Sequence, residues 1–180
     1  MIKDYWKEFY KDNQITNEPS TFAKFIAKYT KNHDIRGKLI DLGCGNGRDT
    51  YYLQESFSTW GIDEQAPNEK GFIKNNVMKQ LRFISSFDVV YSRFFLHTLT
   101  NNNIRKIIQH TTNYFIAETR AVGDIPIIYS NHKRYFTNPG WLIKTLLKEN
   151  FDILYFEKDY DLAKYKEENP LIIRVIAKRK

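Results

Sequence analysis

A glycine-rich loop directly after an apolar segment is the stretch of this sequence best suited to chemistry. Residues 38–42, which read Lys-Leu-Ile-Asp-Leu, run into residues 43–47, which read Gly-Cys-Gly-Asn-Gly. Glycines permit a tight turn and let backbone N–H groups approach a ligand closely. Arg48 occupies the position of the last glycine in the dinucleotide-binding fingerprint, and Asp41, just before the loop, would repel a pyrophosphate. The loop therefore favours a nucleoside-like ligand with a cationic amine and no diphosphate; the alternative is a strand–helix turn that binds nothing.

The acidic residue, the apolar strand and the spaced glycines together resemble the first motif of the class I S-adenosylmethionine-dependent methyltransferases. The resemblance implies S-adenosylmethionine as the cofactor and S-adenosylhomocysteine as the product. It also implies an α/β, Rossmann-like fold, with a mostly parallel seven-stranded sheet, an antiparallel last strand and helices on both faces. The cofactor-binding residues that it assigns to this region are Asp41, Gly43, Cys44, Gly45, Asn46 and Gly47.

Polar residues after the next predicted strands are expected to complete the cofactor site, because ligands bind beyond the carboxyl ends of parallel strands. Asp63 stands twenty positions after the first glycine, a spacing suited to accepting hydrogen bonds from ribose hydroxyls, and Glu64 follows it. The alternative is that Asp63 is a solvated turn carboxylate. Methyltransferases often carry an aspartate at the position of Asn76, whose amide oxygen could still accept a hydrogen bond from the adenine amino group. Val77 and Ser92 are the remaining expected cofactor contacts.

The rest of the chain alternates between strand and helix patterns, which is typical of a mostly parallel sheet covered on both faces. Asn138 is a predicted helix N-cap, with Pro139 at the first helical position. The other predicted helices cover 21–29 and 101–112, and one more begins near residue 48. The predicted strands cover 38–42, 59–62, 72–74, 87–92 and 114–118, with 151–157 and 171–177 as a closing antiparallel pair.

The length and composition of the chain predict one domain over residues 1–180, and the resemblance implies that it is a methyltransferase domain. Residues 1–36 are expected to form an N-terminal cap and helix, and residues 37–180 the core. No apolar run approaches the roughly 20 residues that cross a bilayer, and the first residues are too polar for a signal peptide. The single cysteine, Cys44, excludes an internal disulfide and a multi-cysteine zinc site. We therefore expect a cytoplasmic protein without membrane insertion.

The formal net charge of +7 favours anionic partners. A phosphorylated or nucleotide-linked small molecule is the first candidate. Nucleic acid is less favoured, because the basic residues are scattered and the sequence contains no RNA-binding module. A lysine-rich solvated surface without a partner is the third interpretation, and the oligomeric state stays open.

Segments spread along nearly the whole chain carry a narrower resemblance. They are Asp4-Tyr5-Trp6-x-x-Phe9-Tyr10, Pro19-Ser20-x-Phe22-Ala23, Tyr91-Ser92-Arg93-Phe94-x-x-His97, Glu118-x-Arg120-x-x-x-Asp124, His132-x-Arg134 and Ala163-Lys164-Tyr165-Lys166-x-Glu168-x-Pro170. This pattern is similar to small stand-alone methyltransferases from bacterial capsule and surface-polysaccharide gene clusters. Members of that group are thought to methylate oxygen on sugars or on phosphate-type decorations, including the phosphoramidate of some capsules. The resemblance thus implies an O-methyltransferase of polysaccharide biosynthesis, one product of which would be an O-methyl phosphoramidate.

Basic and aromatic residues near the expected strand ends are candidates for binding the methyl acceptor. Forked guanidiniums and a lysine suit a phosphate-like anion, and few acidic residues are expected beside them. Aromatic side chains could form a lid that excludes water. The acceptor-binding candidates are Arg93, His97, Arg120, His132, Arg134 and Lys166, with the aromatic residues Tyr5, Trp6, Tyr10 and Tyr165.

Two catalytic routes follow, with His97 and Arg93 as the candidate catalytic residues. The sulfonium methyl is already activated, so the protein mainly aligns the acceptor oxygen, without a metal. A sugar hydroxyl would need a general base, for which His97 is the first choice and His132 the second. An anionic oxygen would need no base, and Arg93, Arg120 and Arg134 would orient it. Two other functions stay open: a binding protein without turnover, and an RNA methyltransferase, although the Asn/Asp-Pro-Pro-Tyr/Phe motif of amino-group methylases is absent.

Overall fold

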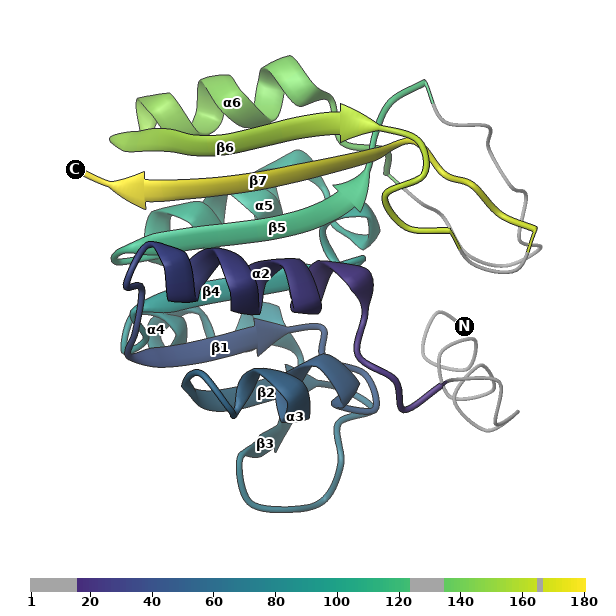
Figure 1. Ribbon diagram of the computed structural model, residues 1–180. Helices are drawn as coiled ribbons and strands as arrows, with labels where there is room; N and C mark the ends of the chain where they lie inside the picture. The colour runs from purple at the N-terminus through teal and green to yellow at the C-terminus, as the bar shows by residue number, and fades with distance from the viewer. Residues whose placement is uncertain (1–15, 124–134, 165–166) are drawn as a thin grey trace.

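A seven-stranded sheet forms the centre of the protein, whose computed structural model describes residues 16–123, 135–164 and 167–180. The strand order is β3-β2-β1-β4-β5-β7-β6. The pairs from β3 to β5 are parallel, whereas β7 runs antiparallel to both β5 and β6 (Figure 1). The predicted fold class is thereby confirmed: the sheet is mostly parallel, and its last strand is antiparallel.

The strands at the middle of the sheet are buried almost completely, as expected when helices cover both faces of a parallel sheet. β1, β4 and β5 each expose at most one end to solvent, whereas β6, at the edge of the sheet, is largely half-exposed. The bounds are β1 Lys38–Leu42, β2 Ser58–Asp63, β3 Phe72–Lys74, β4 Val89–Arg93, β5 Tyr114–Arg120, β6 Phe151–Asp159 and β7 Ile172–Arg179.

Helices cover both faces of the sheet, as predicted (Figure 1). One face carries α2 and α3, whose apolar residues form a buried cluster with the sheet. The other face carries α4, α5 and α6, which pack into a second cluster. The bounds are α2 Thr21–Asn32, α3 Arg48–Leu53, α4 Leu81–Ile84, α5 Asn101–His110 and α6 Pro139–Lys148. No helix within the described ranges is long and apolar enough to span a membrane.

Side-chain caps fix where two of these helices begin. Ser20 Oγ accepts a hydrogen bond from the Ala23 N–H at 3.0 Å at the start of α2. Asn138 Oδ1 accepts one from the Trp141 N–H at 2.9 Å at the start of α6, where Pro139 takes the first helical position. Each cap satisfies an N–H group that a helix leaves unpaired and stabilises it by about 1 kcal/mol. The predicted start of α6 is confirmed.

All predicted elements are present, and their ends differ from the prediction by a few residues. The helix predicted over 101–112 ends at residue 110 because the backbone of Thr111 is extended. The strand predicted over 87–92 covers 89–93 instead. The turns η1 (Val77–Lys79) and η2 (Leu96–Thr98) and the short α4 were not predicted, since they are too short to show a helical period of apolar residues.

Several expected acceptor residues lie outside the described residues, so their roles stay predictions. They are Tyr5, Trp6, Tyr10, His132, Arg134, Tyr165 and Lys166.

Candidate active site

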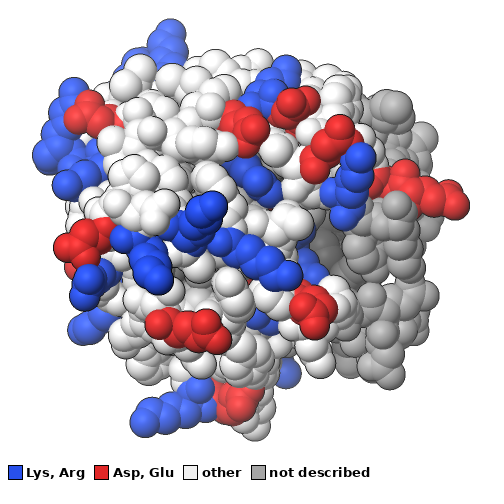
Figure 2. All heavy atoms as spheres, in the orientation of Figure 1, with Lys and Arg blue, Asp and Glu red and all other residues white. Residues whose placement is uncertain are grey.

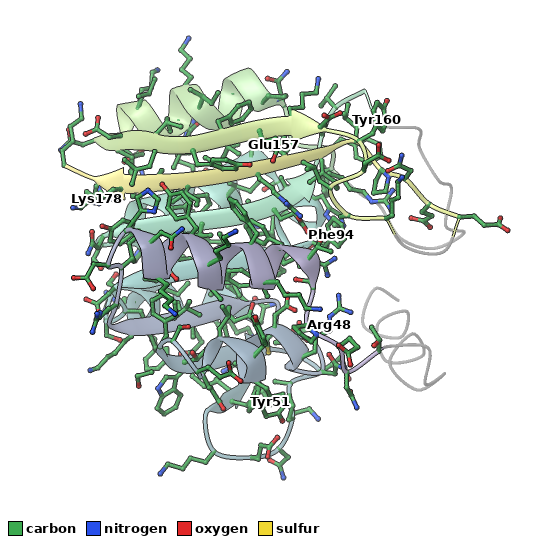
Figure 3. The ribbon with its side chains drawn as sticks, viewed as in Figure 1. Arg48, Tyr51, Phe94, Glu157, Tyr160 and Lys178 are labelled. Atoms are coloured by element: carbon green, nitrogen blue, oxygen red, sulfur yellow. The ribbon has the colours of Figure 1, made fainter. Side chains whose placement is uncertain are left out.

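The loops that follow β1 and β4 meet at the carboxyl ends of the parallel strands. β1 pairs with β2 on one side and with β4 on the other, so the chain order of the strands reverses here. Such a switch point is where α/β sheets of this kind bind ligands. Figure 3 shows Arg48, the first residue of α3, and Phe94, which follows β4, on this same side of the molecule.

The glycine loop takes a backbone course that glycine adopts most easily. Gly43, Gly45 and Gly47 have φ angles of 74°, 57° and 84°. A Cβ at Gly43 would stand 2.7 Å from side-chain atoms of Phe95, and one at Gly47 would stand 2.6 Å from Phe72. The glycine spacing in the sequence is therefore a requirement of the loop itself, and larger residues at these two positions would displace their aromatic neighbours.

Asp41 is a buried carboxyl directly before the loop. It is 2% exposed, and its Oδ2 accepts a hydrogen bond from Thr50 Oγ1 at 2.7 Å. Burial raises the pKa of Asp41 to about 8; the Thr50 hydrogen bond lowers it, and the carboxylates of Asp49 and Asp63 add to the rise. A cation beside this carboxyl would favour its charged form. The site thus fits a ligand with a cationic amine.

Asp63 joins the end of β2 to the glycine loop. Its Oδ1 accepts a hydrogen bond from the Gln65 N–H at 2.7 Å, and the Gly45 N–H is a second backbone donor to the carboxylate. Burial raises the pKa of Asp63 in spite of these two donors. The structure therefore brings Asp63 beside the loop, where the sequence spacing predicted a contact with ribose.

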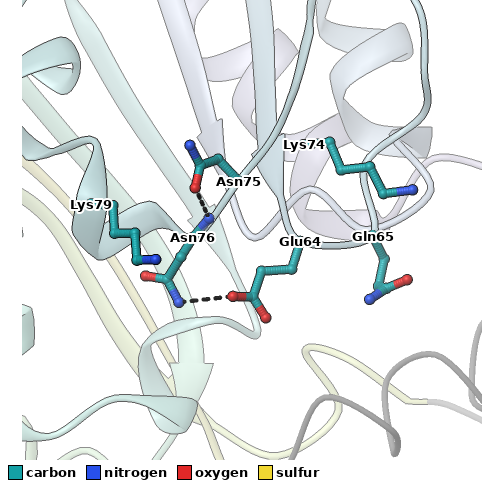
Figure 4. Close-up of a pocket in the computed structure, with 6 residues that line it drawn as sticks. All are labelled: Glu64, Gln65, Lys74, Asn75, Asn76 and Lys79. Atoms are coloured by element: carbon teal, nitrogen blue, oxygen red, sulfur yellow. Dashed lines mark hydrogen bonds between the residues drawn. The ribbon is translucent and has the colours of Figure 1, made fainter.

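A polar hollow opens between the ends of β2 and β3 (Figure 4). Its empty volume, which includes some open solvent, is about 500 Å³. Asn76 Nδ2 donates to Glu64 Oε1 at 3.1 Å, and Asn76 Oδ1 accepts from the Met78 N–H at 2.9 Å. An adenine amino group would therefore share the Asn76 oxygen with the backbone. Lys74, the last residue of β3, and Lys79, the last residue of η1, also line the hollow; sequence reasoning missed both, although Lys74 stands at the end of a predicted strand.

Four other expected cofactor residues lie around this centre in different environments. Asn46 Oδ1 accepts from the Arg48 N–H at 3.4 Å, and Val77 belongs to the buried core. Cys44 is half-buried, and burial raises the pKa of its thiol, which fits a neutral packing residue. Ser92 is fully buried, and its Oγ has no hydrogen-bond partner among the described residues. A bound ligand can supply the partner that such a buried hydroxyl lacks.

Asp49, which sequence reasoning missed, ties three elements together beside the loop. Its carboxylate is 6% exposed and accepts hydrogen bonds from Ser20 N–H at 2.8 Å, Ser20 Oγ at 2.7 Å and Tyr91 Oη at 2.9 Å. These bonds connect α3 to the start of α2 and to β4. The sequence signal that could have identified this role is the position of Asp49, an acidic residue on the apolar side of the short helix α3.

The described arginines on the acceptor side are paired with carboxylates. Glu118, fully buried on β5, accepts hydrogen bonds from Arg93 Nε at 2.9 Å and from Arg174 Nε at 2.8 Å. Burial raises the pKa of Glu118, and the two guanidiniums oppose that rise. Arg120 pairs with Glu168. The expectation of few acidic residues beside these arginines is wrong, because the β4–β5 register places Glu118 directly opposite Arg93.

His97 and Arg93 both contact the ring of Phe94. The ring centroids of His97 and Phe94 are 5.7 Å apart, and Arg93 Cζ lies 4.4 Å from the Phe94 centroid. His97 is 3% exposed, and its carbonyl accepts a hydrogen bond from the Tyr135 N–H at 2.6 Å. The structure thus gathers the two candidate catalytic residues around one aromatic ring just beyond β4.

Several solved structures that resemble this chain are methyltransferases, whereas no protein-family model and no curated protein matches it. The 1,6-didemethyltoxoflavin-N1-methyltransferase of Burkholderia thailandensis, with bound 1,6-didemethyltoxoflavin and S-adenosylhomocysteine, has a TM-score of 0.75 at 14% identity, over 99% of this chain and 86% of that chain. The magnesium protoporphyrin IX methyltransferase of Synechocystis PCC 6803, with bound S-adenosylmethionine, has a TM-score of 0.61 at 14% identity, over 88% and 78%. An S-adenosylmethionine-dependent methyltransferase from Archaeoglobus fulgidus has a TM-score of 0.62 at 15% identity, over 87% and 94%. The chain therefore has the Rossmann-like fold of the class I methyltransferases.

Proposed function

We propose that this protein is an S-adenosylmethionine-dependent methyltransferase that acts on a small molecule. The observation that carries the proposal is the meeting of Asp41, the glycine loop 43–47 and Asp63 at the switch point of the sheet. The carboxyls of Asp41 and Asp63 suit the amine and the ribose of S-adenosylmethionine. Their negative charge disfavours a ligand with a diphosphate. Two solved structures with the same fold hold S-adenosylmethionine or S-adenosylhomocysteine.

The residues of the site would hold the cofactor by its charged and polar ends. Asp41 would receive the ammonium group, Asp63 the ribose hydroxyls, and the hollow beside Glu64 and Asn76 the base, while Ser92 offers a buried hydroxyl that no described residue binds. The cofactor supplies a methyl group that is already activated on a sulfonium. The task left to the protein is to align the acceptor atom with that group, which can contribute several kcal/mol to lowering the barrier.

For the acceptor, we propose an oxygen of a small anionic molecule. Arg93 supports this choice, since it is the last residue of β4, at the edge of the sheet where ligands bind, and the chain carries a net charge of +7. On the sequence resemblance, the acceptor is a phosphorylated or nucleotide-linked precursor of a bacterial capsule or surface polysaccharide, for example one that bears a phosphoramidate. An anionic oxygen needs no general base, whereas a sugar hydroxyl would give that role to His97.

The direct test is incubation with methyl-labelled S-adenosylmethionine and separate pools of nucleotide-linked precursors, phosphorylated metabolites, neutral sugars and RNA. Label in an anionic small-molecule pool supports the proposal, and NMR of the product distinguishes an O-methyl from an N-methyl group. If only neutral sugars become labelled, the acceptor is a sugar hydroxyl and the proposal of an anionic acceptor is wrong. Cofactor binding without label transfer to any pool would favour a binding protein.

RNA is the second candidate acceptor because basic side chains gather on one helix. Lys24, Lys28 and Lys31 are exposed on α2, and Figure 2 shows Lys and Arg side chains gathered over this helix. We expect weak RNA binding that falls steeply as salt rises, since bound phosphates release counterions, and no methylation of bulk RNA. Filter binding across a salt series and counting of labelled RNA measure both. Robust methyl incorporation into RNA would overturn the small-molecule proposal.

Asp63→Ala should weaken the binding of S-adenosylhomocysteine by about 10–100-fold. The ribose hydroxyls would lose an ionic acceptor, whose hydrogen bonds are worth about 1.5–3 kcal/mol. Isothermal titration calorimetry measures the change. Asp152→Ala, which removes an exposed carboxylate on β6, is the matched control and should bind as the natural protein does. If the natural protein, Asp63→Ala and Asp152→Ala bind S-adenosylhomocysteine equally well, Asp63 does not contact the cofactor.

A further inference from the structure

Three charged side chains form a buried row across β4, β5 and β7. The strand register places Arg93 opposite Glu118, and Glu118 opposite Arg174. The Glu118 side chain is completely buried, and those of Arg93 and Arg174 are 18% and 8% exposed. One ionised carboxylate cannot neutralise two guanidiniums, so the row by itself has a net charge of +1.

The two arginines of this row differ in how many of their nitrogens the protein uses. Arg174 donates from Nε to Glu118 and from Nη2 to Leu162 O at 2.8 Å and Thr21 Oγ1 at 3.2 Å. Arg93 donates from Nε to Glu118, and within the described part of the chain its two terminal nitrogens have no hydrogen-bond partner. Arg174 is therefore fixed to the protein, whereas Arg93 keeps two adjacent donors for another group.

The Arg93 guanidinium is also held against Phe94, whose backbone is strained. Phe94 has a φ of 52°, a left-handed conformation that an aromatic residue adopts only when its surroundings enforce it. Its N–H donates to the Glu118 carbonyl at 2.9 Å, which fixes that backbone. Figure 3 shows Phe94 on the side where the parallel strands end. Glu118 and Phe94 thus hold one guanidinium at the edge of the sheet where ligands bind.

We propose that Glu118 and Arg174 are positioning residues that orient Arg93 toward one anionic group of the methyl acceptor. Two adjacent N–H donors match two oxygens of a carboxylate or of a phosphate-type group. The anion would be held through oxygens that do not receive the methyl group. This inference rests on the proposed function and deepens it, because it gives the acceptor an anionic group of stated geometry and gives that group a binding partner.

The substitution Glu118→Gln tests whether anion binding depends on the orientation of the Arg93 guanidinium or only on the net charge of the row. The substitution removes the negative charge of the row and therefore raises its net charge by one unit. If Arg93 acted through charge alone, the variant would bind anions more tightly than the natural protein. If orientation matters, the variant should bind them about tenfold more weakly or worse, because the guanidinium loses the carboxylate that holds it.

The experiment titrates inorganic phosphate and, separately, acetate into the protein saturated with S-adenosylhomocysteine, at constant ionic strength. The NMR signal of the Arg93 Nε–H is followed, and we expect a saturable shift with one of the two probes. Saturation by phosphate indicates a phosphate-type acceptor, and saturation by acetate indicates a carboxylate. Failure to bind S-adenosylhomocysteine would overturn the proposed function, whereas normal binding without any anion response would overturn this inference alone.

A double variant that keeps the natural net charge of the row provides a second test in case Glu118→Gln does not fold. Glu118→Gln/Arg174→Met removes one charge of each sign, so the row keeps its natural net charge but loses the group that anchors Arg93. We expect S-adenosylhomocysteine affinity to stay unchanged and anion affinity to fall about tenfold or more. Arg36→Gln, which removes an exposed guanidinium, should change neither affinity. Natural anion affinity in the double variant would show that Glu118 and Arg174 do not position Arg93.

Discussion

Asp41→Asn should raise the unfolding temperature of the cofactor-free protein above pH 8 and abolish its response to S-adenosylmethionine. Folding raises the pKa of Asp41 from 3.8 to about 8. A carboxyl with a raised pKa contributes stability that is complete below its unfolded pKa and is lost as pH rises through its folded pKa. Above pH 8 the natural protein therefore contains a buried charge that asparagine lacks. We expect a gain on the order of a few kcal/mol in the free energy of unfolding.

Thermal unfolding near pH 5 and near pH 9, with and without cofactor, measures both effects. In the natural protein a bound ammonium group should lower the Asp41 pKa, so affinity should rise with pH as the carboxyl ionises. The cofactor amine itself titrates near pH 8, and the comparison with Asp41→Asn isolates the part that belongs to the protein. Asp152→Asn, on the exposed part of β6, should behave as the natural protein does. If the cofactor raises the unfolding temperature of Asp41→Asn as much as that of the natural protein, Asp41 does not bind the amine.

The strands and long helices were predictable because their apolar patterns are simple. β1 and β4 each have an apolar pair of neighbouring residues in a short segment buried on both faces, and α2 places apolar residues at helical spacing behind a polar cap. The ends were less predictable, since they depend on contacts distant in sequence. Arg179, for example, extends the end of β7 beyond the prediction by donating to the carbonyls of Thr111 and Glu149, which lie far away along the chain.

The cofactor-binding residues could be predicted from their spacing in the sequence, whereas the contacts among the acceptor-binding residues depend on how the strands pair. The glycine loop follows β1 and Asp63 ends β2, two consecutive strands of a parallel sheet, so local sequence suffices to bring them together. The pairing of Glu118 with Arg93 requires knowing that β5 lies beside β4 and in which register. A one-residue slip would turn Glu118 to the other face of the sheet. The buried network around Asp49 depends in the same way on residues remote in the chain.

Arg93→Gln should raise the KM for the acceptor by about 100-fold, whereas His97→Gln should leave kcat within about tenfold. An anion desolvated in the site would lose its charged partner in Arg93→Gln, which costs a few kcal/mol. An anionic oxygen needs no proton acceptor, so the rate should not depend on the His97 imidazole. Steady-state and single-turnover rates with the acceptor found by label transfer measure the difference, and Arg36→Gln is the control for a general loss of positive charge.

The opposite pattern would identify a hydroxyl acceptor. His97 stands beside the same Phe94 ring as Arg93, so it is placed to act as a general base if a proton has to leave. In that case His97→Gln should reduce the chemical step by about 10²–10⁴-fold. The rate of the natural protein should then rise with pH as the imidazole loses its proton, because only the neutral ring can accept one. Such a loss in the single-turnover rate, with Arg93→Gln close to the natural protein, would replace the anionic acceptor with a sugar hydroxyl.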